Sequence, residues 1–175
     1  MMKKLIILSV FTMTSFLTNA QVGLKGYVLE KFDSKGAEKT TIGGVNGILK
    51  AYTLNKGKIY AIEFISCQDE YLNLTNLINP DDCDSISQGD IDLVKEGLEY
   101  KFGIEFGGYK GVSGGRYREA SKNNVWFKFF IYDIKNSTAR AIRIYIYNEK
   151  LNELHKKENQ AREKDEIRRA ANDFD

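Results

Sequence analysis

The alternation of apolar and polar positions predicts a β-hairpin in the first half of the chain. The segments 45–53 and 58–66 are rich in β-branched and aromatic residues, and Asn55-Lys56-Gly57 between them is a typical hairpin turn. The second segment carries apolar side chains on both faces, so we expect both faces of this strand to be partly covered.

A second hairpin is predicted near the C-terminus, where the segments 125–134 and 139–148 flank a polar turn. In 139–148 three isoleucines alternate with Arg143, Tyr145 and Tyr147, which is the pattern of a half-buried antiparallel strand. The segment 125–134 is apolar on both faces, as is typical of a central strand covered on both sides.

Two helices are also predicted. Between about Gly89 and Phe102 the apolar residues recur at helical spacing, and Gly103 directly follows, as a glycine that ends a helix does. The segment 149–173 consists of helix-forming residues without Pro or Gly. Its apolar residues are sparse, so we expect only its first two turns to dock and the remainder to project.

These elements predict a single α+β domain over residues 21–175. We expect an antiparallel sheet of about four or five strands, built from the two hairpins, with the mid-chain helix and the C-terminal helix packed on one face. We interpret 21–44 as a polar, glycine-dotted lead-in to the first hairpin. The segment 107–115 holds five glycines in nine residues, which predicts a loop or an irregular strand.

The first twenty residues have the three parts of a bacterial secretory signal peptide. Met1 to Lys4 form a short cationic start, 5–17 is apolar apart from Ser and Thr, and Ala20 is the small residue that signal peptidase requires. The apolar stretch is shorter than the ~20 residues that span a bilayer. Gln21 stands where a lipoprotein would have Cys. We therefore expect cleavage after Ala20 and a soluble protein in the periplasm or outside the cell.

Removal of residues 1–20 leaves a chain without net charge. The whole chain has 26 Lys and Arg against 24 Asp and Glu, and Lys3 and Lys4 are the two excess cations. A bulk electrostatic attraction to nucleic acid or to an anionic membrane is therefore absent. We expect neither nucleic acid binding nor membrane insertion after cleavage.

Both cysteines, Cys67 and Cys83, follow the signal segment. In an oxidising compartment such a pair usually forms a disulfide, and closing a loop of this length stabilises a fold by about 3 kcal/mol. The spacing is wider than the Cys-x-x-Cys of redox pairs. We therefore predict a structural disulfide, with two free or metal-bound thiols as the alternative.

The glycine-rich segment 107–115 is accompanied by cationic residues. It does not match a phosphate-binding P-loop, because the Gly-Lys-Ser/Thr ending is missing and the segment follows a helix instead of a strand. Lys110, Arg116 and Arg118 are nevertheless the natural contacts for an anion here, so these three residues form a weak candidate ligand site.

Aromatic residues of the second hairpin form another weak candidate site. Trp126, Tyr132, Tyr145 and Tyr147 would lie on one sheet face if the registers of the two strands align. Such a patch suits recognition of a protein, a glycan or a peptide. It equally suits core packing beneath the C-terminal helix, and the sequence leaves this alternative open.

The sequence contains no complete catalytic or cofactor motif. His155 is the only histidine and lies among charged residues of the C-terminal helix, so a histidine-based catalytic or zinc site is not expected. The acidic stretch from Asp81 to Asp92 lacks the glycine and glutamate positions of an EF-hand. We therefore predict neither a metal nor a cofactor.

These observations favour an exported, soluble, non-enzymatic binding module, whose partner is an envelope or extracellular protein or a small ligand. Two alternatives stay open. One is a small exported hydrolase whose carboxylates and tyrosines are brought together only by the fold; the other is an envelope structural or assembly protein that acts through its C-terminal helix. Two close carboxylates in a pocket would favour the enzyme, whereas an exposed aromatic sheet face would favour the binding module.

Overall fold

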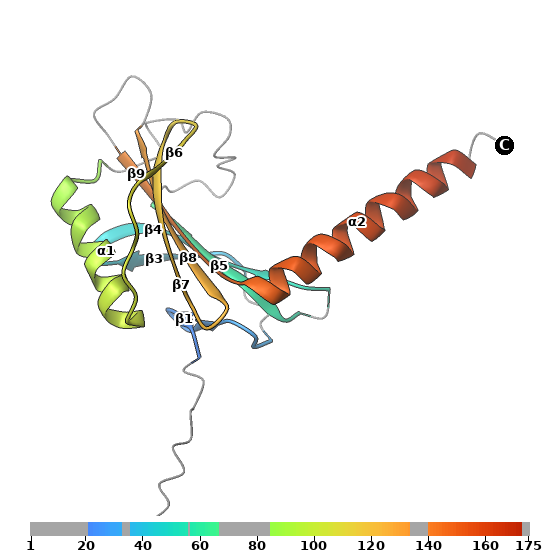
Figure 1. Cartoon of the computed structure of the whole chain (residues 1–175), viewed down its shortest axis with the longest axis horizontal. Coiled ribbons are helices and arrows are strands. Elements are labelled where there is room, and N and C mark those ends of the chain that lie inside the picture. The colour runs from blue at the N-terminus through green and yellow to red at the C-terminus, as the bar shows by residue number, and fades with distance from the viewer. Residues whose placement is uncertain (1–20, 33–35, 56, 67–84, 134–139, 173–175) are drawn as a thin grey trace, which may run out of the picture.

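The computed structural model describes residues 21–32, 36–55, 57–66, 85–133 and 140–172. Its main element is a seven-stranded antiparallel sheet in the order β3-β4-β5-β9-β8-β7-β6 (Figure 1). Its strands are β3 (Glu38–Ile42), β4 (Val45–Thr53), β5 (Ile59–Ile65), β6 (Lys110–Val112), β7 (Gly115–Lys122), β8 (Val125–Asp133) and β9 (Arg140–Asn148). A separate short pair is formed by β1 (Gly23–Leu24) and β2 (Tyr27–Val28), and the helices are α1 (Gln88–Phe102) and α2 (Glu149–Asn172). The α+β class predicted from the sequence is thus confirmed.

The main sheet consists of two meanders that meet at its centre. Strands β3 to β5 are consecutive neighbours, and so are strands β6 to β9. The seam between them is the antiparallel pair β5–β9, in which Ile62 lies opposite Ile146 and Phe64 opposite Ile144. All four of these side chains are at most 1 % exposed. The seam therefore runs through the hydrophobic core.

Helix α1 covers one face of the sheet (Figure 1). It begins after Ser87, whose side chain accepts a hydrogen bond from the backbone N–H of Asp90, and it ends at Gly103, which has the left-handed conformation (φ 59°). The buried residues of α1, which join the core on this face, are Ile91, Val94 and Leu98. The helix predicted for this region is confirmed.

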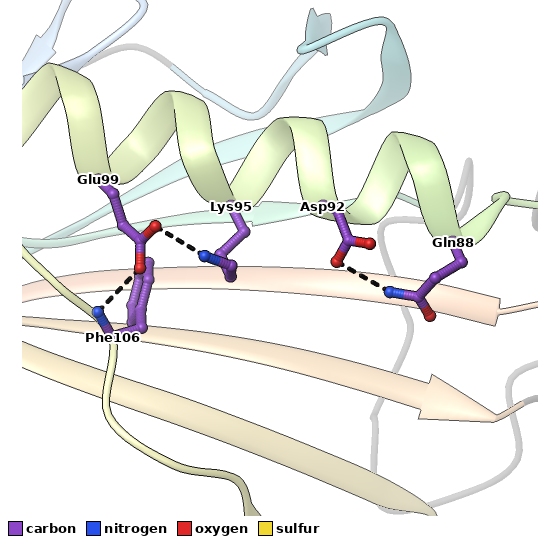
Figure 2. Close-up of polar contacts among 5 residues, drawn as sticks. All are labelled: Gln88, Asp92, Lys95, Glu99 and Phe106. Atoms are coloured by element: carbon purple, nitrogen blue, oxygen red, sulfur yellow. Dashed lines mark hydrogen bonds and ion pairs between the residues drawn. The ribbon is translucent and has the colours of Figure 1, made fainter.

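A glutamate on α1 fixes the chain that follows the helix. Lys95 Nζ donates to Glu99 Oε2 at 2.6 Å, and the backbone N–H of Phe106 donates to Oε1 at 3.0 Å (Figure 2). Burial alone would raise the pKa of Glu99, but these hydrogen bonds lower it overall. Phe106 is thereby held against Phe129 of β8, with ring centroids 6.0 Å apart.

Helix α2 packs only at its start, and against the other face of the sheet. Leu151 joins a cluster with Leu54 and Tyr60, and His155 stacks on the ring of Tyr60 with centroids 4.3 Å apart. Every residue from 160 to 170 is exposed, and this half of the helix extends away from the sheet (Figure 1). The prediction that both helices pack on one face is therefore wrong. Because α2 follows β9 without a loop, Leu151 meets the face on which Tyr147 lies.

The sheet has more strands than the four or five predicted. The additional strands β3 and β7 lack apolar alternation, because β3 is a mostly exposed edge strand and β7 is rich in charged residues. Their hairpin turns are visible in the sequence, however. Gly43-Gly44 and Asn123-Asn124 have positive φ at both positions, as two-residue hairpin turns require. Within the glycine-rich segment, the irregular strand is the short, exposed edge strand β6.

Several predictions fall outside the described residues. These are the signal peptide at 1–20 and the disulfide between Cys67 and Cys83, and both stay predictions. Within the described part of the chain, no helix is both long and apolar enough to cross a membrane.

Candidate functional site

The candidate functional site is the face of the sheet opposite α1, which we call the open face. Residues that pair across antiparallel strands share a face, so the strand registers define rows that run across the sheet. The first row is Tyr52, Ala61, Tyr147, Trp126 and Ser121. The second row is Lys50, Glu63, Tyr145, Lys128 and Glu119. The third row is Ile65, Arg143, Phe130, Tyr117 and Lys110.

A β-bulge adds Tyr60 to the open face. Tyr52 pairs with Ala61, while the next residue along β4 pairs with Ile59, so β5 holds one extra residue at this point. Ile59 belongs to the core beneath α1, whereas Tyr60 and Ala61 both belong to the cluster on the open face. Because His155 stacks on Tyr60, the bulge also anchors α2 at the margin of the open face.

A buried carboxylate lies at the centre of the open face. Glu63 is 4 % exposed, and both of its oxygens are engaged: Arg143 Nε donates to Oε1 in an ion pair, and the hydroxyl of Tyr52 donates to Oε2. Arg143 also hydrogen-bonds to the hydroxyl of Tyr132. A buried charge is costly unless it is paired and hydrogen-bonded. This network meets both conditions and fixes the positions of four side chains.

Arg143 connects this network to the aromatic rings around it. Its guanidinium carbon lies 5.4 Å from the ring centroids of Phe130 and of Tyr145, within the range of cation–π attraction. Phe130 in turn stacks with Tyr117 at 5.1 Å and with Tyr132 at 5.9 Å between centroids. These rings and Arg143 therefore form a continuous packed layer, and all but Tyr132 are half-buried rather than hidden.

A second cation is held in the same way. Lys128 Nζ lies 5.7 Å from the ring centroid of Tyr117 and 5.8 Å from that of Tyr147. It also lies 4.0 Å from Glu119 Oε2, and the other oxygen of Glu119 is paired with Lys110. Aromatic and cationic side chains thus alternate across the strands.

Burial raises the pKa of five tyrosines in this region; they are Tyr52, Tyr60, Tyr132, Tyr145 and Tyr147. Loss of hydration of the phenolate is the main cause in each, and the negative charge of Glu63 adds to it in all except Tyr147. At neutral pH these hydroxyls are therefore hydrogen-bonding groups without charge.

Both carboxylates of the three rows are already engaged by neighbouring side chains. Glu63 has no free oxygen, and Glu119, the other carboxylate in the three rows, lies three strands away and is paired with lysine. General acid–base chemistry needs a titrating group within reach of a substrate proton. Among the residues that the structure describes, no three His, Cys, Asp or Glu side chains gather in a way that could hold a metal ion.

The four aromatic residues singled out in the sequence share the open face. Tyr147 lies opposite Trp126 in the first row, while Tyr145 and Tyr132 project from the same face of β9 and β8. Tyr132 is buried, and the other three are half-buried. Helix α2 reaches only the margin of this surface, where Leu151 contacts the tyrosine cluster.

Of the three cationic residues of the glycine-rich region, only Arg116 and Arg118 come together. Lys110 lies on the open face, opposite Tyr117. Arg116 and Arg118 point to the α1 side, where their guanidinium carbons lie 4.9 and 3.9 Å from the ring centroid of Tyr109. The hairpin register between β6 and β7 separates Lys110 from the two arginines, because neighbouring positions of a strand point to opposite faces.

The residues that sequence reasoning missed are Glu63 and Tyr52. Glu63 and its partner Arg143 are 80 positions apart, so no local pattern connects them. One signal was present, however. Glu63 is the only charged residue in the otherwise apolar segment 59–65, and a charge inside a buried strand requires a partner.

Comparison with known proteins adds no relative to this description. No family model matches the chain, and neither curated proteins nor solved structures gave a match.

Proposed function

We propose that this chain is an exported, non-enzymatic binding module that binds a protein partner through the open face. The observation that carries the proposal is the gathering of half-buried tyrosine, tryptophan and arginine side chains, with Arg143 and the rings around it in mutual contact, on a surface that α1 does not cover. Tyr, Trp and Arg are the residues that contribute most to binding at protein interfaces.

The location of the cavities supports a protein rather than a small ligand. A cavity of about 220 Å³ lies between α1 and β3, and a groove of about 1200 Å³ lies around the β7–β8 turn. Residues of the three rows line neither of them. Small ligands are usually bound in concave pockets, whereas a protein partner can use a broad surface of this kind.

The rigidity of the open face favours binding as well. The hydrogen bonds of Glu63 and the ring contacts of Arg143 hold the aromatic side chains before any partner arrives. Ordering each mobile side chain at an interface costs about 0.5–1.5 kcal/mol. Much of that cost is absent here, because the side chains are already ordered by folding.

The charges of the open face define the chemistry of the partner. Glu63 is buried and neutralised by Arg143, while Lys50 is exposed at the β4 end and Lys128 is partly exposed near the centre. The surface therefore presents cations between aromatic rings. We propose a partner surface with apolar side chains and carboxylates, which complements both features.

The proposal is tested with two variants that have matched changes. Tyr117→Ser with Lys128→Glu removes a ring and reverses a charge on the open face. Tyr100→Ser with Lys164→Glu makes the same changes at exposed positions on α1 and α2. The mature chain and both variants are used to capture proteins from the envelope of the producing cell, with a photo-crosslinking residue placed at position 145.

A partner that crosslinks to the mature chain and to the α1/α2 variant, but not to the open-face variant, supports the proposal. Equal crosslinking to all three proteins contradicts it. A chain truncated after Gln160 serves as a third comparison. If the partner is lost on truncation while the open-face variant retains it, binding resides in α2 and the proposal is wrong.

A further inference from the structure

A second surface, separate from the open face, lies at the end of the sheet near the β1–β2 arch. It is a groove of about 1200 Å³ between that arch, the end of α1, the β7–β8 turn and the junction of β9 with α2. The segments that line it are 21–23, 25–31, 101–102, 122–125, Phe127, Asn148 and 150–151. The groove thus joins parts of the chain that are far apart in sequence.

The charges around this groove are strongly unbalanced. Its lysines, all exposed, are Lys25, Lys31, Lys101, Lys122 and Lys150. The only lining carboxylate is Glu30, which accepts a hydrogen bond from Asn148 Nδ2 at 2.8 Å. Within the described residues, none of the five lysines forms an ion pair, and Lys122 donates to the carbonyl oxygens of Phe102 and Gly103.

This imbalance contrasts with the chain as a whole. Residues 21–175 carry equal numbers of cationic and anionic side chains, since the two excess cations are Lys3 and Lys4. The groove therefore concentrates positive charge that the rest of the surface offsets. A cleft lined by one sign of charge focuses its field and attracts ligands of the opposite sign.

The inner wall of the groove is apolar. Tyr27, Val125 and Phe127 form its buried base, and half-buried side chains such as Phe102 and Leu151 complete the wall. An inorganic anion would leave the accessible part of this wall, on half-buried side chains such as Val22, Phe102 and Leu151, in contact with water. A ligand with an apolar segment would cover it while its charged group meets the lysines.

We propose that this groove binds a single anionic amphiphile, with a phosphate group held by the lysine rim and an acyl segment on the apolar wall. Lysine is a compact charge suited to phosphate. The proposal does not depend on the open face, because the two surfaces share no residue of the three rows.

The test measures binding of a short-chain phosphatidylglycerol, used as a monomer, by calorimetry with the mature chain. Lys31→Ala with Lys150→Ala removes two cations of the rim. At an anionic membrane surface each lysine contributes about fivefold to the affinity. For a single lipid molecule, the loss of two lysines should therefore weaken binding by no more than about 25-fold. Lys39→Ala with Lys164→Ala is the matched control and should bind like the parent, since neither lysine lines the groove. Unfolding midpoints check that both variants are folded.

Three further ligands define the outcomes. Glycerol phosphate should bind more weakly than the amphiphile, which shows that the acyl segment contributes, and added salt should weaken both. Short-chain phosphatidylcholine, which carries the same phosphate but no net charge, should bind more weakly than phosphatidylglycerol. Equal binding of phosphatidylcholine, unchanged binding by the Lys31/Lys150 variant, or tighter binding of an acidic peptide would each overturn the proposal. Binding to phosphatidylglycerol vesicles without binding to the monomer would overturn it too.

Discussion

Replacing Arg143 by Met tests the buried network of the open face. The substitution removes the cationic partner of Glu63 and keeps an unbranched side chain between Phe130 and Tyr145. The side chain of Glu63 is 5 % exposed, whereas that of Arg143 is 26 % exposed. The two halves of the ion pair therefore have different access to water once their partner is gone.

The expected loss of stability follows from this asymmetry. In Arg143→Met the carboxylate stays buried, with only the hydroxyl of Tyr52 as a donor, and the free energy of unfolding should fall by about 3 kcal/mol. In Glu63→Gln the guanidinium can be hydrated, and the new amide oxygen can still accept from Tyr52, so the loss should be about 1 kcal/mol. The double variant Glu63→Gln with Arg143→Met has no charge at either position and should be more stable than Arg143→Met.

Urea unfolding of the parent and the three variants at neutral pH measures these differences. Trp126, the only tryptophan, lies on the open face and reports the transition by its fluorescence. If Glu63→Gln destabilises the protein more than Arg143→Met, or if the double variant is less stable than Arg143→Met, the reasoning is wrong.

Four further predictions concern other parts of the molecule. In an alkaline titration followed by tyrosinate absorbance, the five tyrosines with a raised pKa should ionise at higher pH than an exposed tyrosine. Their contribution to stability is present below the unfolded pKa of about 10 and is lost as pH rises through their folded pKa values. Ionisation of these tyrosines without unfolding would contradict this prediction. Gly47→Ala should lower the unfolding free energy by at least about 2 kcal/mol, because a Cβ there would lie 2.2 Å from the carbonyl oxygen of Ile65. At Gly97 on α1 an added Cβ would meet no atom within 4 Å. Gly97→Ala should therefore raise the unfolding free energy by about 1 kcal/mol. Truncation after Gln160 should change the unfolding free energy by less than about 0.5 kcal/mol, since residues 160–170 are exposed. A larger loss would show that this half of α2 packs against the rest of the protein.

The parts of the fold that could be predicted are those whose packing repeats along the chain. Strands β4, β5, β8 and β9 alternate or carry dense apolar residues, and α1 has apolar residues at helical spacing with a glycine stop. Strand β3 lies at the edge of the sheet, where most of its side chains meet water, so burial imposes no pattern on it. Strand β7 could not be predicted for another reason. Its positions on the core face are occupied by Arg116 and Arg118, whose long side chains stack on Tyr109.

The candidate site also has a part that could be predicted from the sequence and a part that could not. The four aromatic residues of the second hairpin could be placed on one face, because the alternation within two neighbouring strands is a local property. The pairing of Glu63 with Arg143 depends on the β5–β9 register, which no neighbouring residues encode. The lysine-lined groove near the β1–β2 arch is assembled from four separate parts of the chain, so its concentration of positive charge arises only when the chain is folded.

The seam between β5 and β9 has a consequence for how the chain folds. All residues of β5 from Ile59 to Phe64 are buried, yet one edge of this strand is completed only by β9, the last strand of the chain. Until residue 148 has been synthesised, that edge has no partner, and an unpaired apolar edge promotes association with other chains. Pairing over such a distance also slows folding. A chain of this topology can therefore complete the centre of its sheet only after residue 148 has been synthesised.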